Sequence, residues 1–131
     1  MKRKAAGRVE TQLSPSGFIE QHYIGPQTAD SVQKAIGSLK TYINKLKIEK
    51  KPVLILLDMS RLKITFDAQA RMAAVKGMRE VHYDRGAFYG PLRVLVLINT
   101  LAMVSGVQHK VKAFGERLDA IRWLKGNGGE S

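Results

Sequence analysis

The chain of 131 residues contains no cysteine, and this absence excludes several kinds of site at once. Disulfides, zinc–thiolate sites, iron–sulfur clusters and thiol nucleophiles all depend on cysteine sulfur. A chain without cysteine fits a reducing compartment, and we expect a cytoplasmic protein. No apolar run approaches the roughly 20 residues that span a bilayer. No apolar stretch of signal-peptide length follows the basic N-terminus MKRKAAG, so we expect no transmembrane or export segment.

Acidic residues are half as numerous as basic ones, 11 against 22, and the net charge at pH 7 is +11. Such a charge attracts nucleic acid, anionic membranes and acidic proteins without choosing among them. Aromatic residues make up only 7% of the chain and do not interleave with basic residues as in proteins that stack single-stranded bases. A basic nucleic-acid-associated protein is therefore kept as an alternative, beside the simpler interpretation of a highly soluble surface.

The sequence also lacks the patterns of known reactive centres. Its three histidines stand on separate predicted elements, so we expect no metal site. The glycines of GAFYG precede an apolar run, whereas a phosphate-binding loop follows a strand and opens a helix. No serine has the strand–turn–helix surroundings of a nucleophile elbow. We therefore expect no enzymatic activity and no cofactor.

The apolar patterns in the first half predict a hairpin, a helix and a buried strand. Residues 8–13 and 18–24 bracket the turn SPSG and are predicted to form the hairpin. Thr28 is predicted to cap a helix whose apolar residues recur at steps of three and four as far as Leu46. Residues 53–57 form a continuous apolar run, which is typical of a strand covered on both faces.

The second half continues the alternation of helices and strands. The sequence predicts a helix over Asp67 to Val81, a loop over YDRGAFYGPL because of its glycines and proline, and a second buried strand, RVLVLI, from Arg93 to Ile98. The remaining predicted elements are a short helix over residues 100–108, an edge strand within 109–114 and a terminal helix over 116–125.

Strands that alternate with helices indicate an α/β fold. We predict a sandwich of a mixed, partly parallel sheet with helices packed on it, joined by right-handed crossovers. One domain is expected to span residues 8–125, between a disordered basic N-terminus at 1–7 and a flexible tail at 126–131.

Polar residues after the run 53–57 allow two interpretations. Ligands of open α/β sheets usually lie outside the carboxyl ends of strands, where Asp58 and Ser60 are expected. Asn99 and Thr100 would end the neighbouring predicted strand at the same edge. In the second, purely structural interpretation, Asp58 satisfies loop amides and Asp67 caps the next helix.

Three segments resemble the STAS domain, the fold of bacterial anti-sigma factor antagonists and of the cytoplasmic tails of sulfate transporters. They are VLILLDMSRL, RVLVLI and AFGERLDAIRWL. In the last segment Phe114, Ala120, Trp123 and Leu124 are similar to a stand-alone branch of STAS-like proteins that ends in an Ala-x-x-Trp-Leu helix. The resemblance covers most of the chain after residue 7. It implies a STAS-like fold and a module that binds protein partners, sometimes nucleotides or lipids, without an enzymatic centre.

The sequence departs from the regulatory STAS branch at the phosphorylated motif Asp-Ser-Ser-Gly. The corresponding stretch is ITFDAQAR. With one extra residue allowed, Ala68 and Gln69 stand where the serines belong; without it, Asp67 stands on the acceptor serine and resembles a permanently charged mimic. Ser60 and Thr65 are the nearby hydroxyls that are left. The resemblance therefore implies a binding module without the kinase-controlled switch.

Our first hypothesis is a regulatory or scaffold module that binds a protein partner through the loop from Asp58 to Asp67 and the following helix. The predicted partner-binding residues are Asp58, Ser60, Arg61, Thr65, Asp67, Gln69 and Arg71. A further alternative is a carrier of a small apolar ligand or lipid, with Met72, Met78 and Met103 lining the space. A homodimer is also considered, because Phe88 and Tyr89 are aromatic residues in a predicted loop.

Overall fold

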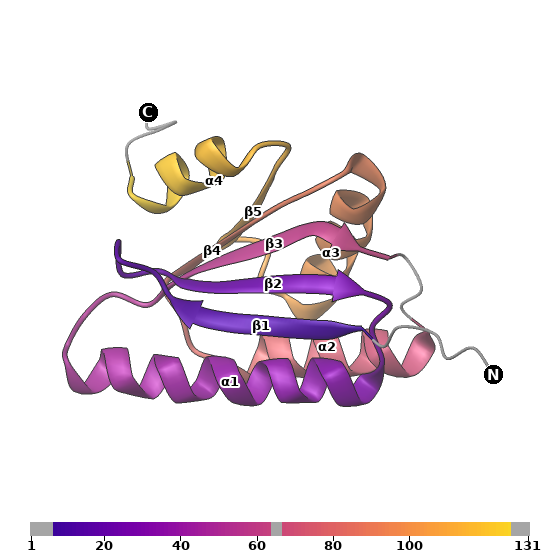
Figure 1. Cartoon of the computed structure of the whole chain (residues 1–131), viewed down its shortest axis with the longest axis horizontal. Helices are drawn as coiled ribbons and strands as arrows, with labels where there is room; N and C mark the ends of the chain where they lie inside the picture. The colour runs from indigo at the N-terminus through magenta and orange to yellow at the C-terminus, as the bar shows by residue number, and fades with distance from the viewer. Residues whose placement is uncertain (1–6, 64–66, 127–131) are drawn as a thin grey trace.

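The computed structural model describes residues 7–63 and 67–126. Its elements in chain order are β1 (Arg8–Leu13), β2 (Ile19–Gly25), α1 (Ala29–Ile48), β3 (Leu54–Leu62), α2 (Ala68–Glu80), β4 (Arg85–Tyr89), α3 (Leu92–Ser105), β5 (Val111–Phe114) and α4 (Arg117–Leu124) (Figure 1). The predicted ends of the chain, 1–7 and 126–131, lie almost entirely outside the described residues, and the domain limits stay a prediction.

The strands form one sheet in the order β1-β2-β3-β4-β5. β1 is antiparallel to β2, and each later strand is parallel to its neighbour. Because the chain visits the parallel strands in their spatial order, right-handed crossovers place all three connecting helices on the same face. We call this the three-helix face, covered by α1, α2 and α3. Of the described helices, α4 alone lies on the opposite face, which we call the α4 face (Figure 1).

The core lies mostly between the sheet and the three-helix layer. Tyr23, Met59 and Phe88 point from the strands into a cluster formed with residues of all three helices. On the α4 face, a smaller cluster joins Leu56 and Ala87 of the sheet to residues of α4. The predicted α/β sandwich with a mixed, partly parallel sheet is therefore confirmed. Among the described residues, no helix is both long and apolar enough to cross a membrane.

Local signals placed the first elements correctly. The hairpin turns at SPSG, where Gly17 has φ +92°, a value that glycine adopts without strain. The Thr28 side chain accepts a hydrogen bond from the Ser31 amide, and the Ser31 hydroxyl accepts one from the Thr28 amide. This reciprocal capping begins α1 at the predicted place.

The strand predicted at Arg93 to Ile98 is wrong, because these residues belong to α3. Val94, Ile98 and Leu101 are buried at steps of four and three, the spacing of one helix face. The helix predicted over residues 100–108 is thus the second half of a longer one, which ends at Gly106 with φ +77°. A β-branched apolar run favours a strand locally, and packing against α2 and the sheet overrides that preference.

The actual neighbour of β3 is β4, which the sequence predicted to be a loop. The glycine directly after β4 serves close packing in place of a turn: a Cβ at Gly90 would lie 3.1 Å from the backbone of Met59. Phe88 is only 1% exposed, and Tyr89 is buried too. The loop aromatics on which a homodimer was considered are therefore core residues.

Candidate functional site

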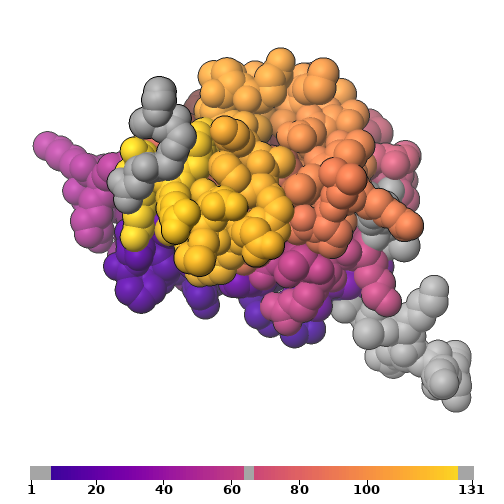
Figure 2. All heavy atoms as spheres, turned by 90° about the horizontal axis from the view of Figure 1, so that it is seen from above, coloured from indigo at the N-terminus to yellow at the C-terminus, as the bar shows by residue number. Residues whose placement is uncertain are grey.

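A polar cluster occupies the α4 face where the parallel strands approach their carboxyl ends. α4 has only eight residues. In the view from above, it occupies only part of the visible surface (Figure 2). Strand register brings polar residues together beside it: His22 of β2 pairs with Asp58 of β3, and Asp58 pairs with Tyr89 of β4. Glu20 lies two residues before His22, on the same face of β2.

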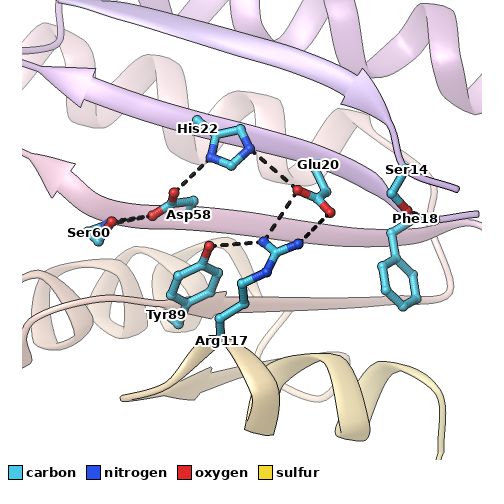
Figure 3. Close-up of polar contacts among 8 residues, drawn as sticks. All are labelled: Ser14, Phe18, Glu20, His22, Asp58, Ser60, Tyr89 and Arg117. Carbon is cyan, nitrogen blue, oxygen red and sulfur yellow. Dashed lines mark hydrogen bonds and ion pairs between the residues drawn. The ribbon is translucent and has the colours of Figure 1, made fainter. Parts of the chain in front are cut away.

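Asp58 is the centre of one half of this cluster. Its carboxylate accepts hydrogen bonds from the Ser60 amide at 2.9 Å and the Ser60 hydroxyl at 2.6 Å, and its Oδ2 lies 2.7 Å from His22 Nδ1 (Figure 3). Burial favours the neutral acid, but the bonds from Ser60 and His22 outweigh it and hold the pKa of Asp58 below its usual range.

Serine, aspartate and histidine meet here in an order that does not make a catalytic triad. In a triad the imidazole lies between the serine and the carboxylate and takes the serine proton. Here Asp58 lies between Ser60 and His22, and His22 Nε2 faces Glu20 Oε1 at 3.4 Å. The Ser60 hydroxyl therefore donates to a carboxylate and has no imidazole base beside it.

Arg117, the first residue of α4, joins the second half of the cluster. Its Nη2 donates to Glu20 Oε2 at 2.9 Å, and its Nη1 donates to the Tyr89 hydroxyl at 3.1 Å (Figure 3). The bonds to Glu20 and Tyr89 raise the pKa of Arg117. Burial raises the pKa of Tyr89, although Arg117 opposes the shift. The cluster thus ties the start of α4 to two strands of the sheet.

The cluster is satisfied internally. Among the described residues that are not exposed, no buried side-chain nitrogen or oxygen lacks a hydrogen-bond partner. Across residues 7–63 and 67–126, no group of three or more His, Cys, Asp or Glu side chains could hold a metal ion. Because Arg117 of α4 binds Glu20 of β2 and Tyr89 of β4, we interpret the cluster as a clamp that fixes α4.

Sequence reasoning missed Glu20, His22, Tyr89 and Arg117 as a group, since Glu20 and Arg117 are 97 residues apart. It also placed Asp58 at the end of a strand, whereas β3 continues to Leu62 and holds Asp58 inside it. Asn99 and Thr100, expected at the same sheet edge, are exposed residues of α3.

The predicted partner-binding residues fall into separate places. Asp58 is buried in the clamp, while Ser60 and Arg61 are exposed near the end of β3. Thr65 lies outside the described residues. Asp67 is the predicted N-cap of α2, because its Oδ1 accepts from the Ala70 amide at 2.8 Å.

Gln69 and Arg71 are exposed on α2 and line a groove of about 880 Å³ that we call the α2 groove. Its other walls come from the start of α1 and the end of α3. The groove is lined by Ala29, Gln33, Gln69, Arg71, Met72, Ala73, Val75, Lys76, Arg79, Glu80 and Val104. The α2 groove thus contains both exposed apolar side chains and several positively charged ones.

An apolar cavity of about 70 Å³ lies between the sheet and the three-helix layer. Tyr23, Met59 and Phe88 line its sheet side, and Met78 of α2 lines its helix side. Met72 and Met103, which we grouped with Met78 as lining residues, are exposed on the surface instead. The methionines therefore do not line one common space.

The arrangement defines the class of fold. A mixed five-stranded sheet with three crossover helices on one face and a C-terminal helix on the other is STAS-like, that is, SpoIIAA-like. An uncharacterised protein of the DUF3478 family from Shewanella loihica PV-4, whose crystal structure has a SpoIIAA-like fold, superposes with a TM-score of 0.68. The match covers 95% of this chain and 99% of that one at 16% identity, so it shows the fold alone. No family model matches the sequence, and no curated protein matches it.

Proposed function

We propose that the chain is a non-enzymatic, STAS-like regulatory or scaffold module that binds an acidic protein partner through the α2 groove. The observation that carries the proposal is the composition of this groove. Met72 is 72% exposed and Val104 is 57% exposed, and both line it. Exposed apolar side chains with charged residues around them are typical of protein interaction sites.

The charges of the α2 groove favour an acidic partner. Arg71, Lys76 and Arg79 all lie on α2 around Met72. The chain as a whole carries +11, so its long-range field also attracts acidic surfaces. A partner segment that places an apolar side chain on Met72 and carboxylates beside the cations would satisfy both features.

The proposal of a non-enzymatic module is supported by the order of groups in the clamp. Ser60 donates to Asp58, which is also bonded to His22 and has a lowered pKa, so the carboxylate is a weak base toward the hydroxyl. Arg117 is held by Glu20 and Tyr89 and points into the same closed network. The cluster is better suited to fixing α4 than to proton transfer.

Affinity capture with charge-reversal variants tests the α2 groove. Met72→Glu and Arg71→Glu change exposed groove residues, whereas changing Asp67 would also remove the helix cap. Leu118→Glu and Lys125→Glu make the same chemical changes on or after α4, across the sheet. We expect a partner that is captured by wild type and both controls, and lost with both groove variants.

The captured partner is then purified and titrated against each variant. We expect the groove variants to weaken binding at least tenfold and high salt to weaken wild-type binding, because rim charges are screened. A partner that binds all five proteins equally would contradict the proposed surface. Capture that disappears after nuclease treatment would favour the nucleic-acid alternative.

A second candidate function, the carriage of a small apolar ligand, is favoured by the apolar cavity. At about 70 Å³ the cavity is smaller than the roughly 150 Å³ that accommodates benzene. A lipid chain would therefore require the helices to move away from the sheet. Native mass spectrometry tests this candidate: a co-purified apolar molecule supports it, and bare protein mass contradicts it.

A further inference from the structure

The two edges of the sheet differ in how well they resist strand pairing. β5 has four residues and carries the exposed Lys112, and a short edge with lysine is protected against pairing. β1 has six residues, RVETQL, with neither lysine nor proline. A groove of about 550 Å³ runs beside β1, lined by Arg8 and Val9 of the strand and by the small Ser31 and Ser38 of α1. Among the described strands, none pairs with the outer side of β1, so β1 is the edge better suited to another strand.

The hairpin hydrogen bonds show which backbone groups of β1 face outward. The Ser14 amide donates to the Phe18 carbonyl at 2.8 Å, so this pair is hydrogen-bonded. In an antiparallel ladder, hydrogen-bonded and non-hydrogen-bonded pairs alternate. The even-numbered residues of β1 therefore bond β2. Val9, Thr11 and Leu13 present their N–H and C=O groups to the free edge.

We propose that β1 pairs antiparallel with β1 of a second copy of this chain, about a two-fold axis at Thr11. In this register Val9 faces the partner's Leu13 and Thr11 faces the partner's Thr11, so all the outward groups of β1 bond across the axis. On the α4 face, Glu10 lies opposite the partner's Gln12. Apolar, hydroxyl and acid–amide pairs are thus each matched, and no like charges oppose each other.

Neighbouring registers match less well. A shift toward the N-terminus by one pairing step places Glu10 opposite the partner's Glu10, which is repulsive. A shift by two steps pairs Arg8 with the partner's Glu10, but it leaves Leu13 without a partner inside β1. A shift toward the C-terminus leaves Val9 beyond the partner's β1. Only the Thr11-centred register pairs all three outward residues of β1, Val9, Thr11 and Leu13, inside the partner's β1, and an isologous dimer closes this edge.

Cysteine cross-linking tests the pairing directly, because the chain has no cysteine of its own. Opposed residues of a hydrogen-bonded antiparallel pair have Cα atoms about 5.5 Å apart, within the range of a disulfide. We expect Thr11→Cys to form a covalent dimer under mild oxidation, and Lys112→Cys at the other edge to stay monomeric. Circular dichroism checks that Thr11→Cys is folded, because Gln21 donates to the Thr11 hydroxyl in wild type. Cross-linking through Lys112→Cys only, or through neither, would overturn the proposal.

Gln12 provides a second test, because its side chain is exposed. Its cross-strand neighbour in β2 is Glu20 of the clamp, so urea unfolding checks that each variant keeps a folded monomer. Gln12→Glu places a glutamate opposite Glu10 of the other copy on each side of the axis. Gln12→Lys places a lysine opposite the same glutamate. By sedimentation equilibrium we expect the first change to weaken the dimer and the second to strengthen it, each by about tenfold, because each pair occurs twice. Equal dissociation constants, or wild type that is monomeric at every concentration, would overturn the inference.

Ionic strength separates this dimer from the proposed acidic partner. Each copy carries +11, so salt screens the repulsion between copies and should strengthen the dimer. Salt should weaken binding of an acidic protein at the α2 groove. Dimerisation that is unaffected by Met72→Glu and partner binding that is unaffected by the Gln12 variants would show that the two surfaces act separately.

Discussion

Asp58 is a buried carboxylate whose hydrogen bonds favour its charged form. The two bonds from Ser60 and the contact with His22 hold the pKa of Asp58 below its usual range despite burial. A group whose pKa is lower in the folded chain stabilises the fold above its unfolded pKa, about 3.9 for aspartate. That contribution is lost as the pH falls through the lower, folded value. Asp58 should therefore make stability depend on pH in the acidic range.

We predict that Asp58→Asn lowers the free energy of unfolding at pH 7 by about 1–3 kcal/mol. The amide group of asparagine would face the donors of Ser60 or His22, leaving a buried polar group without a partner. Urea unfolding measures the difference, which should shrink toward pH 3 as wild type loses the contribution of the carboxylate. Asp119→Asn, on the exposed side of α4, is the control and should change stability by less than about 0.5 kcal/mol. If the difference in the free energy of unfolding between wild type and Asp58→Asn stays constant with pH, the role given to Asp58 is wrong.

The capping roles of Thr28 and Asp67 could be predicted from sequence, because a cap depends on residues within one turn. The contact between His22 and Asp58 could not, since it depends on parallel pairing of two strands 36 residues apart. Arg117 joins that site only after α4 packs on the opposite face. A helix cap can thus be predicted from a few neighbouring residues. The clamp cannot, because its residues meet only through the register of the folded sheet.

At the scale of elements, α4 is a short helix held at both ends by arginine. Arg117 binds Glu20 and Tyr89 at its start. Arg85 of β4 donates to the carbonyls of Trp123 and Leu124 at its end and lies over the Trp123 ring. Eight residues bury little apolar surface, so these polar anchors matter for docking.

We predict that Arg117→Gln loosens α4 and destabilises the chain by about 1–3 kcal/mol, because Glu20 is then buried without its cation. The Glu20 side chain is only 6% exposed. The single tryptophan, Trp123, lies on α4, so its fluorescence should shift to the red before global unfolding in urea. Arg122→Gln is the control, because Arg122 lies on the same helix and makes only an exposed ion pair with Asp119. It should neither destabilise the chain nor shift the fluorescence. Glu20→Gln should cost little further stability once Arg117→Gln is present. If it lowers the free energy of unfolding as much as it does in wild type, Arg117 and Glu20 do not stabilise each other.

The end of α1 has a residue in an unfavourable conformation. The Lys51 amide donates to the Leu46 carbonyl and the Lys50 amide to the Lys47 carbonyl, the pattern of a Schellman motif. Lys50 has φ +58° at the position where α3 has Gly106. A side chain in this region is strained, and glycine is not.

Lys50→Gly should therefore stabilise the chain by about 0.5–1 kcal/mol. Thermal and urea unfolding measure the gain. Lys51→Gly removes the same charge from the adjacent residue, where φ is not positive, and should be neutral or destabilising. Equal effects of the two changes would assign the gain to charge and not to backbone strain.

The local sequence of β4 and α3 predicts the wrong element at each place. Gly86, Gly90 and Pro91 were read as a loop and RVLVLI as a strand, although the order of strands and helices was predicted correctly. Gly90, directly after β4, allows close approach to Met59, which only the assembled sheet reveals. Pro91 is the N-cap of α3, where its missing N–H removes no hydrogen bond within the helix. Apolar runs alone did not separate a buried strand from a buried helix.

The whole molecule combines an unequal sandwich with a large excess of positive charge. Three helices bury one face of the sheet, and one short helix leaves room for a polar clamp on the other. Most ion pairs in the described residues, such as Lys34 with Asp30 and Lys40 with Glu80, are exposed and contribute little. Repulsion among the remaining cations should therefore dominate the response to salt.

We predict that added sodium chloride raises the urea midpoint of unfolding, because folding concentrates a charge of +11 in a small volume. Between about 10 and 150 mM salt the screening length falls from roughly 30 to 8 Å, so most of the effect should occur in this range. A triple variant, Lys45→Gln, Lys47→Gln and Lys125→Gln, removes three exposed cations and should reduce the salt dependence. Measurements at low protein concentration keep self-association out of the comparison. A midpoint that falls with salt would mean that attractive pairs such as Arg117 with Glu20 outweigh the net charge.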